Sequence, residues 1–186
     1  MNQICINVVY VLCSILLFSC DTNNNVTSYR IKSPQPTPTV IENIPEQLNW
    51  TKPKNWIQKP ATNMRLASFE ISDLNGDIAD VSISIFPGNV GGIKANVNRW
   101  RGQIDLLPQN EEDIMKNVIK EIHPFLGECL IFKLENNINN KAITVIISEQ
   151  NNQTLFIKIS GSTQILSAVE AEFGYFYKSL HWDNNS

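Results

Sequence analysis

Strict alternation of apolar and polar residues in Val81-Ser82-Ile83-Ser84-Ile85 is the feature that most constrains how this chain folds. A period of two puts successive side chains on opposite faces of a β-strand, so one face is expected to be buried and the other to contact water. Residues 64–71 also have the composition of a strand, and Asn75-Gly76 lies between the two segments. Both residues of this pair tolerate the positive φ of a tight turn, so the sequence predicts a β-hairpin.

Three further segments, 129–135, 142–148 and 154–160, are rich in apolar and β-branched residues and are predicted to be strands. The asparagine-rich run 136–140 between the first two is a natural turn. Residues 111–124 fit a short helix or a strand equally well. Such consecutive hairpins are typical of an antiparallel sheet.

Two segments have the apolar spacing of helices. In residues 91–106 a single stripe contains Ile93, Val97, Trp100 and Ile104. In residues 162–181 the buried side is expected to contain Leu166, Val169, Phe173, Phe176 and Leu180, with Ser162 or Thr163 as the N-cap. The sequence therefore predicts an α+β fold, an antiparallel β-sheet with helices packed on it.

Charge and composition exclude one class of function. The chain has 15 basic and 18 acidic residues, a formal net charge of −3, and no block of either sign. Nucleic-acid binding requires a concentrated basic face, so it is not expected. Hydrophobic residues make up 42% of the chain, which suffices for a packed core.

The first 20 residues indicate export. Residues 4–19 form an apolar stretch without charge, shorter than the roughly 20 residues that cross a bilayer as a helix. They end in Leu17-Phe18-Ser19-Cys20, which resembles the lipobox of bacterial lipoproteins. The resemblance implies cleavage before Cys20, a diacylglycerol on its sulfur and an acylated amino group. The region lacks the usual Lys or Arg, so a short uncleaved membrane anchor is the other interpretation; both place the domain outside the cytoplasm.

The predicted domain organisation follows from the lipoprotein interpretation. Residues 1–19 are a lipoprotein signal peptide, residues 20–47 a lipidated cysteine with a flexible tether rich in Pro and Asn, and residues 48–183 a single globular α+β domain. Of the four cysteines only Cys20 and Cys129 remain after cleavage. The domain is then free of internal disulfides, and Cys129 is interpreted as a buried hydrophobic residue.

The segment 88–103 is the candidate binding site. It joins the end of a strand, a glycine-rich turn and the start of a helix, where free N–H groups and the helix dipole favour an anion. The alternative is that the glycines only let the chain reverse and pack closely. The candidate ligand or partner residues are Gly91, Gly92, Asn96, Arg99, Arg101 and Gln103.

No catalytic, metal or cofactor site is expected. Neither His123 nor His181 has a partner at metal-ligand spacing, and no nucleophile elbow or Cys-x-x-Cys pair is present. Asp73, Asn75 and Asp77 superficially resemble a calcium loop, but the glycine and glutamate that such a loop needs are missing, so a turn is predicted.

Several runs together resemble a family of uncharacterised bacterial lipoproteins, over nearly all of residues 48–182. They are Trp50…Trp56, Met64-Arg65-Leu66-Ala67-Ser68-Phe69, Phe86-Pro87-Gly88, Asn96-Val97-Asn98-Arg99-Trp100-Arg101-Gly102-Gln103, Phe156-Ile157-Lys158-Ile159-Ser160-Gly161 and Phe173…Phe176…Ser179-Leu180. The chain departs from the family at Leu155-Phe156, where a tryptophan followed by an aromatic residue is expected. The layout is similar to the PsbP-like α/β/α sandwich, whose members mostly act as accessory or assembly factors.

The resulting expectation is a lipid-anchored protein of the bacterial cell envelope without catalytic activity, held on the inner or outer membrane and acting as an accessory or scaffold for an envelope protein. The alternative expectation is a module that binds a small anionic ligand through residues 88–103.

Lipidation gives a first prediction. Mass spectrometry of the protein from its native membrane is expected to find a mature chain that begins at Cys20 and carries acyl groups. Cys20→Ser is expected to abolish both cleavage and acylation, whereas Cys129→Ser should change neither. An intact Met1 or an unmodified Cys20 in the native protein would contradict the prediction.

Overall fold

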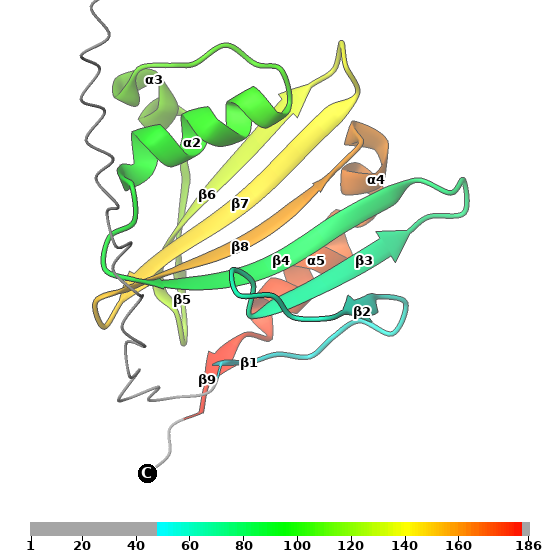
Figure 1. Cartoon of the computed structure of the whole chain (residues 1–186), viewed down its shortest axis with the longest axis horizontal. Helices are drawn as coiled ribbons and strands as arrows, with labels where there is room; N and C mark the ends of the chain where they lie inside the picture. Colours follow the sequence, from blue (N-terminus) through cyan, green and yellow to red (C-terminus); the bar gives the residue numbers. More distant parts are fainter. Residues whose placement is uncertain (1–47, 184–186) are drawn as a thin grey trace, which may run out of the picture. The chain divides into compact units, whose positions relative to one another are not determined.

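The alternating segments pair into one antiparallel sheet in the computed structural model, which describes residues 48–183 (Figure 1). Across the sheet the seven strands are β2 (Ile57–Lys59), β3 (Ala67–Ser72), β4 (Ile78–Pro87), β8 (Gln153–Gly161), β7 (Lys141–Gln150), β6 (Gly127–Asn136) and β5 (Ile119–His123). Strands β2 to β4 form one meander and strands β5 to β8 form another, and the two meanders are joined by the pairing of β4 with β8. The signal segment 1–19, the tether 20–47 and Cys20 lie outside the described residues.

The predicted hairpin is confirmed by the pairing of β3 with β4. Gly76 has φ of 86°, and the Asp73 carboxylate accepts the N–H groups of Asn75 and Asp77 at 2.8 and 2.9 Å. The acidic residues of this segment therefore close a turn, as predicted, because the Asp73 side chain takes the place of a backbone acceptor.

Asparagine closes the turns of the second meander. The predicted strands at 129–135, 142–148 and 154–160 are confirmed as β6, β7 and β8. Asn140, in the turn between β6 and β7, has φ of 50°, and Asn151 and Asn152, between β7 and β8, have φ of 50° and 57°. Asparagine enters this left-handed region more readily than other residues with a side chain, so it can serve where glycine is usual.

Within residues 48–183 four helices accompany the sheet, and one prediction about them was wrong. They are α2 (Gly92–Gln103), α3 (Glu111–Lys116), α4 (Thr163–Ala168) and α5 (Glu170–Lys178). The ambiguous segment 111–124 contains both a helix and a strand, α3 followed by β5. The predicted single helix 162–181 is broken at Val169, whose φ of −102° and ψ of 6° leave the helical region. Ser162 caps α4 as expected, because its side chain accepts the N–H of Ile165 at 3.2 Å.

The helices lie on both faces of the sheet, so the predicted α+β fold is confirmed, with the α/β/α layering that was expected (Figure 1). On one face, α4 and α5 close a core in which the rings of Trp56, Phe69 and Phe176 pack with centroids 4.8 to 5.7 Å apart. On the other face, Trp100 of α2 packs against Phe156 of β8 with centroids 5.8 Å apart.

The ends of the described chain lie beside each other. The strand β1 (Leu48–Asn49) pairs with β9 (His181–Trp182) in a separate two-stranded sheet. Within residues 48–183, no helix combines the length and the apolar character that crossing a bilayer demands.

A buried histidine lies at the end of β5. His123 is 2% exposed, and its Nδ1 accepts the N–H groups of Phe125 and Leu126, both at 3.2 Å. The ring proton is therefore assigned to Nε2, which has no hydrogen-bond partner among the described residues. Burial lowers the pKa of His123, and the nearby backbone of Tyr177 and Lys178 opposes this effect only in part. His123 is consequently neutral in the folded domain near neutral pH.

Acid should destabilise the domain through His123. Because its pKa is lower in the folded than in the unfolded chain, the unfolded chain takes up the extra proton as pH falls below about 6.5. We expect the free energy of unfolding to decrease below that pH, with a slope approaching about 1.4 kcal/mol per pH unit. Urea unfolding between pH 5 and 7.5 measures it.

His123→Asn keeps an acceptor near the position of Nδ1 and removes the titration, so it should flatten this slope. His181→Gln is the matched control and should retain it. An unchanged slope in His123→Asn would refute the assignment.

Candidate functional site

The glycine-rich turn before α2 is held by a buried asparagine. Gly91 and Gly92 have φ of 77° and 67°, conformations that residues with a side chain rarely adopt. Asn96, which is 5% exposed, donates from Nδ2 to the Val90 carbonyl at 2.7 Å. Its Oδ1 accepts from Nη2 of Arg99 at 2.8 Å. Asn96 thus fastens the turn to the helix and holds Arg99.

Arg99 and Gln103, four residues apart on α2, face β8. The Gln103 carboxamide oxygen accepts from the Nζ of Lys158 at 3.3 Å. The guanidinium carbon of Arg99 lies 6.0 Å from the centroid of the Trp100 ring. Sequence reasoning missed Lys158, because it lies inside an apolar strand segment and only strand register places it beside α2.

The α2 side of the sheet is divided by polarity. Towards β6 and β7 it presents the apolar residues that α2 covers, including Phe132 and Val145. Towards β3 and β4 it presents Ser68, Ser82 and Asp80. Lys158 of β8 is the Cα partner of Ser82. We call this polar part the charged half-face; no helix of the described residues packs on it.

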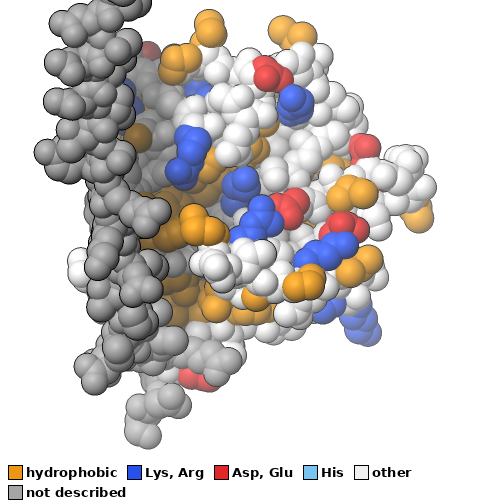
Figure 2. All heavy atoms as spheres, viewed as in Figure 1, with side chains coloured by type: hydrophobic (Ala, Val, Ile, Leu, Met, Phe, Trp, Pro, Cys, Tyr) orange, Lys and Arg blue, Asp and Glu red, His pale blue; other side chains and the backbone are white. Residues whose placement is uncertain are grey.

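Cations outnumber carboxylates on the charged half-face and along the edge of α2 beside it. Figure 2 shows Lys and Arg side chains gathered there with fewer Asp and Glu side chains among them. Two ion pairs are present, Lys59–Glu70 at 2.8 Å and Arg65–Asp80 at 2.9 Å. The cations are Lys59, Arg65, Arg99 and Lys158, and the carboxylates are Glu70 and Asp80.

Arg65 and Lys158 also explain one detail of β4 that differs from the prediction. Ser82 was expected to contact water but is only 5% exposed. Its strand partners are Ser68, which accepts from the Arg65 guanidinium at 3.4 Å, and Lys158. Long basic side chains beside Ser82 therefore take the place of solvent.

Lys158 is the electrostatic centre of this surface. Burial is the largest cause that lowers the pKa of Lys158, and the positive charges of Arg65 and Arg99 lower it further. Asp80 opposes this shift, but it already pairs with Arg65. No ion pair of the described residues includes Lys158 or Arg99. An approaching anion would therefore relieve repulsion among these cations.

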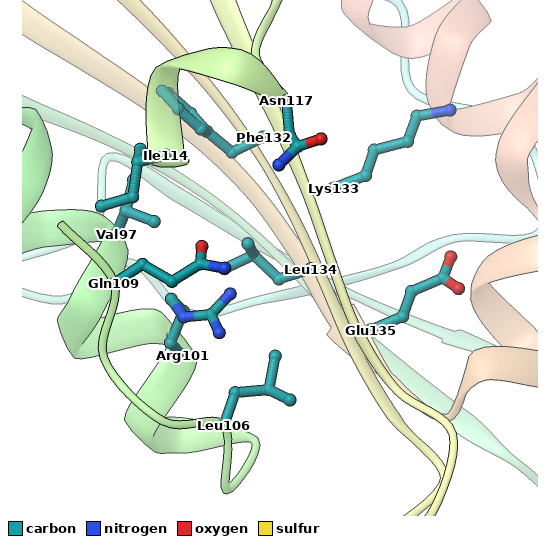
Figure 3. A pocket seen from close by; sticks show the side chains of 10 residues that line it. All are labelled: Val97, Arg101, Leu106, Gln109, Ile114, Asn117, Phe132, Lys133, Leu134 and Glu135. Carbon is teal, nitrogen blue, oxygen red and sulfur yellow. The ribbon is translucent and has the colours of Figure 1, made fainter. Parts of the chain in front are cut away.

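Arg101 lies in a different place, in a pocket between α2, α3 and β6 with a volume of about 270 Å³ (Figure 3). Its Nε donates to the Leu107 carbonyl at 2.7 Å. The pocket is lined by Val97, Arg101, Leu106, Gln109, Ile114, Asn117, Phe132, Lys133, Leu134 and Glu135. Figure 3 shows that Lys133 and Glu135 extend to the opposite side of β6 from Phe132 and Leu134, away from α2.

The six candidate residues are thus divided among three places. Gly91, Gly92 and Asn96 form the turn, Arg99 and Gln103 border the charged half-face, and Arg101 lines the pocket. Sequence reasoning did not identify Gln109, since a polar residue in a loop carries no periodic signal.

The residues considered for catalysis are separated from these surfaces. His123 is buried against Tyr177, with ring centroids 4.9 Å apart. Cys129 is fully buried as predicted, and burial raises the pKa of its thiol, so this thiol is a poor nucleophile at neutral pH. No cluster of metal-ligating side chains occurs within residues 48–183.

Comparisons with known proteins found similarity in fold alone. Neither a protein-family model nor a curated protein matches this chain. Among solved structures, it is similar to a protein of Bacteroides thetaiotaomicron VPI-5482 (15% identity, TM-score 0.44), over 74% of this chain and 46% of that one. The chain thus corresponds to less than half of that protein.

Two further solved structures are each similar over 74% of this chain. LpqN, involved in cell envelope biogenesis of Mycobacterium tuberculosis, is 13% identical and is covered over 85% of its length, with a TM-score of 0.42. The cyanobacterial PsbP (CyanoP) of Synechocystis sp. PCC 6803 is 15% identical and is covered over 94%, with a TM-score of 0.41.

Asn96 gives a prediction for the turn. Asn96→Ala leaves the Val90 carbonyl and the Arg99 guanidinium without this partner, so we expect the free energy of unfolding to fall by about 1–3 kcal/mol. Urea unfolding measures the change. Lys94→Ala, at an exposed position of the same helix, should stay within about 0.5 kcal/mol of the native chain. Equal stability of the two variants would show that Asn96 does not hold the turn.

Proposed function

We propose that this chain is a lipoprotein anchored through Cys20 on the extracytoplasmic side of a bacterial membrane, where its domain acts as a non-catalytic accessory or scaffold protein. The lipobox-like run Leu17-Phe18-Ser19-Cys20 supports the anchor. Two or three acyl chains, at about 0.8 kcal/mol per buried methylene, suffice for stable attachment.

The observation that carries the accessory role is the excess of cations around Lys158. Neither Lys158 nor Arg99 forms an ion pair in the described residues, although the chain as a whole carries a net charge of −3. Arranging unpaired like charges beside one another is unfavourable, and contact with an acidic surface offsets this cost. The charged half-face is therefore proposed to dock on its partner.

The arrangement of the cations favours a protein surface as the occupant. Arg65, Lys158 and Arg99 come from the turn before β3, from β8 and from α2, and the small side chains of Ser68 and Ser82 lie between Arg65 and Lys158. Such a spread of charges over neighbouring elements suits an extended acidic patch, which engages several cations at once. We propose an envelope protein with an acidic surface as the partner.

Photo-crosslinking in living cells tests the docking role. A photoreactive amino acid at Ser84, the partly exposed residue that follows Ser82 on the same side of β4 and borders the charged half-face, is expected to give one discrete adduct with an envelope protein. Replacement of Arg99 by Glu places a carboxylate beside Lys158, neutralises the excess charge and should lower the adduct yield at least tenfold.

Lys178→Glu is the control, because Lys178 is exposed in the last turn of α5, on the other face of the sheet. This variant should give the native yield. Purification of the crosslinked partner and titration with salt should show weaker binding at higher ionic strength. Absence of a discrete adduct, or equal yields from Arg99→Glu and the native chain, would refute docking through the charged half-face.

A further inference from the structure

We propose that the pocket beside Arg101 binds a carboxylate that carries a small branched apolar group. Arg101 belongs to the 88–103 segment in which an anion site was expected, but the pocket lies at the C-terminal end of α2, on the side away from Lys158, and most of its lining comes from residues outside that segment. The proposal is independent of docking through the charged half-face.

The floor of the pocket is apolar and belongs to the core. Val97, Ile114 and Phe132 are at most 3% exposed, and Leu134 is 8% exposed. These packed side chains form the bottom of an open space of about 270 Å³. An apolar group that enters this space contacts Leu134 and the partly buried Leu106, and its own apolar surface is removed from water, which supplies favourable free energy for binding.

The rim supplies a cation and an amide. Arg101 uses only its Nε for the contact with Leu107, and no carboxylate of the described residues pairs with its guanidinium. In the view of Figure 3, the side chains of Arg101 and Gln109 both extend towards Leu134. A guanidinium with free N–H groups is suited to a carboxylate, because the planar donors match its two oxygens. The Gln109 amide is a further donor.

The loop that carries Gln109 is fixed to α2 through its backbone. Asn98 accepts the N–H of Gln109 at 2.8 Å, and its Nδ2 donates to the Gln109 carbonyl, also at 2.8 Å. Together with the bond from Arg101 to Leu107, these contacts fix the loop that forms the rim of the pocket to α2. A site whose residues are already held in place loses little conformational entropy when a ligand binds.

The anionic part of the ligand follows from the charges that face the space. Glu135 and Lys133 reach the other side of β6, where Lys133 pairs with Glu170 of α5 at 2.6 Å. Arg101 is therefore the charged group that the pocket presents, and burial lowers its pKa without removing its charge at physiological pH. A neutral apolar ligand would leave this guanidinium without its preferred partner.

Calorimetric titration of the full chain in a non-ionic detergent tests the proposal, with 4-methylpentanoate as the probe and empty micelles as the blank. We expect saturable binding with a Kd on the order of 1 mM, as suits a fragment of this size. Its methyl ester, which lacks the charge, and acetate, which lacks the apolar group, should each bind at least tenfold more weakly.

Variants then locate the site. Arg101→Gln should weaken binding of 4-methylpentanoate at least tenfold. Gln109→Ala should weaken it about threefold, and it leaves the backbone contacts of the loop to Asn98 in place, so it tests the site even where Arg101→Gln disturbs folding. Lys94→Gln removes a charge from the same helix outside the pocket and should bind as the native chain does.

Two sources of such a carboxylate are distinguished by a second probe. Tighter binding of N-acetyl-leucine than of 4-methylpentanoate would indicate the C-terminus of a peptide, and weaker binding a free carboxylic acid. Equal affinity for the acid and its methyl ester, no saturable binding, or native affinity in both Arg101→Gln and Gln109→Ala would overturn the proposal.

Discussion

The contact of Trp100 with Phe156 places α2, and most of what distinguishes this domain follows from where that helix lies. The α2 side of the sheet is apolar over β6 and β7 and polar over β3 and β4, with β8 at the boundary. An amphipathic helix packs on the apolar part, since only there does it remove apolar surface from water. The polar part is left to long charged side chains. One helix therefore separates two surfaces of different character.

These two surfaces use opposite flanks of α2. Arg99 and Gln103 are four residues apart and face Lys158, whereas Arg101 points towards the loop that contains Gln109. The first flank borders an extended surface, and the second borders an enclosed space. The spacing of basic residues along α2 thus places Arg99 and Arg101 at two separate surfaces.

The sequence was sufficient to predict elements whose pattern is local. Alternation at 81–85, the turn at Asn75-Gly76 and the stripe of Val97 and Trp100 depend on neighbours along the chain. The strand, the hairpin and the helix were each confirmed, and only the expected exposure of Ser82 was wrong. The break at Val169 was not predicted, because apolar spacing runs through it without interruption. The site residues depend on register between distant segments. Lys158 reaches α2 only because β8 pairs with β4, a pairing that no local pattern encodes.

The asparagine-rich composition has a consequence for how this sheet forms. Asn140, Asn151 and Asn152 hold the left-handed backbone that closes both hairpins of the β6–β7–β8 meander. Glycine would accept that geometry with less strain, but it would also leave the unfolded chain far more conformations to lose on ordering. Asparagine reduces the number of conformations open to the unfolded chain at the turns that join these consecutive strands. The hairpins beneath α2 therefore form with a smaller loss of conformational entropy than they would with glycine in these turns.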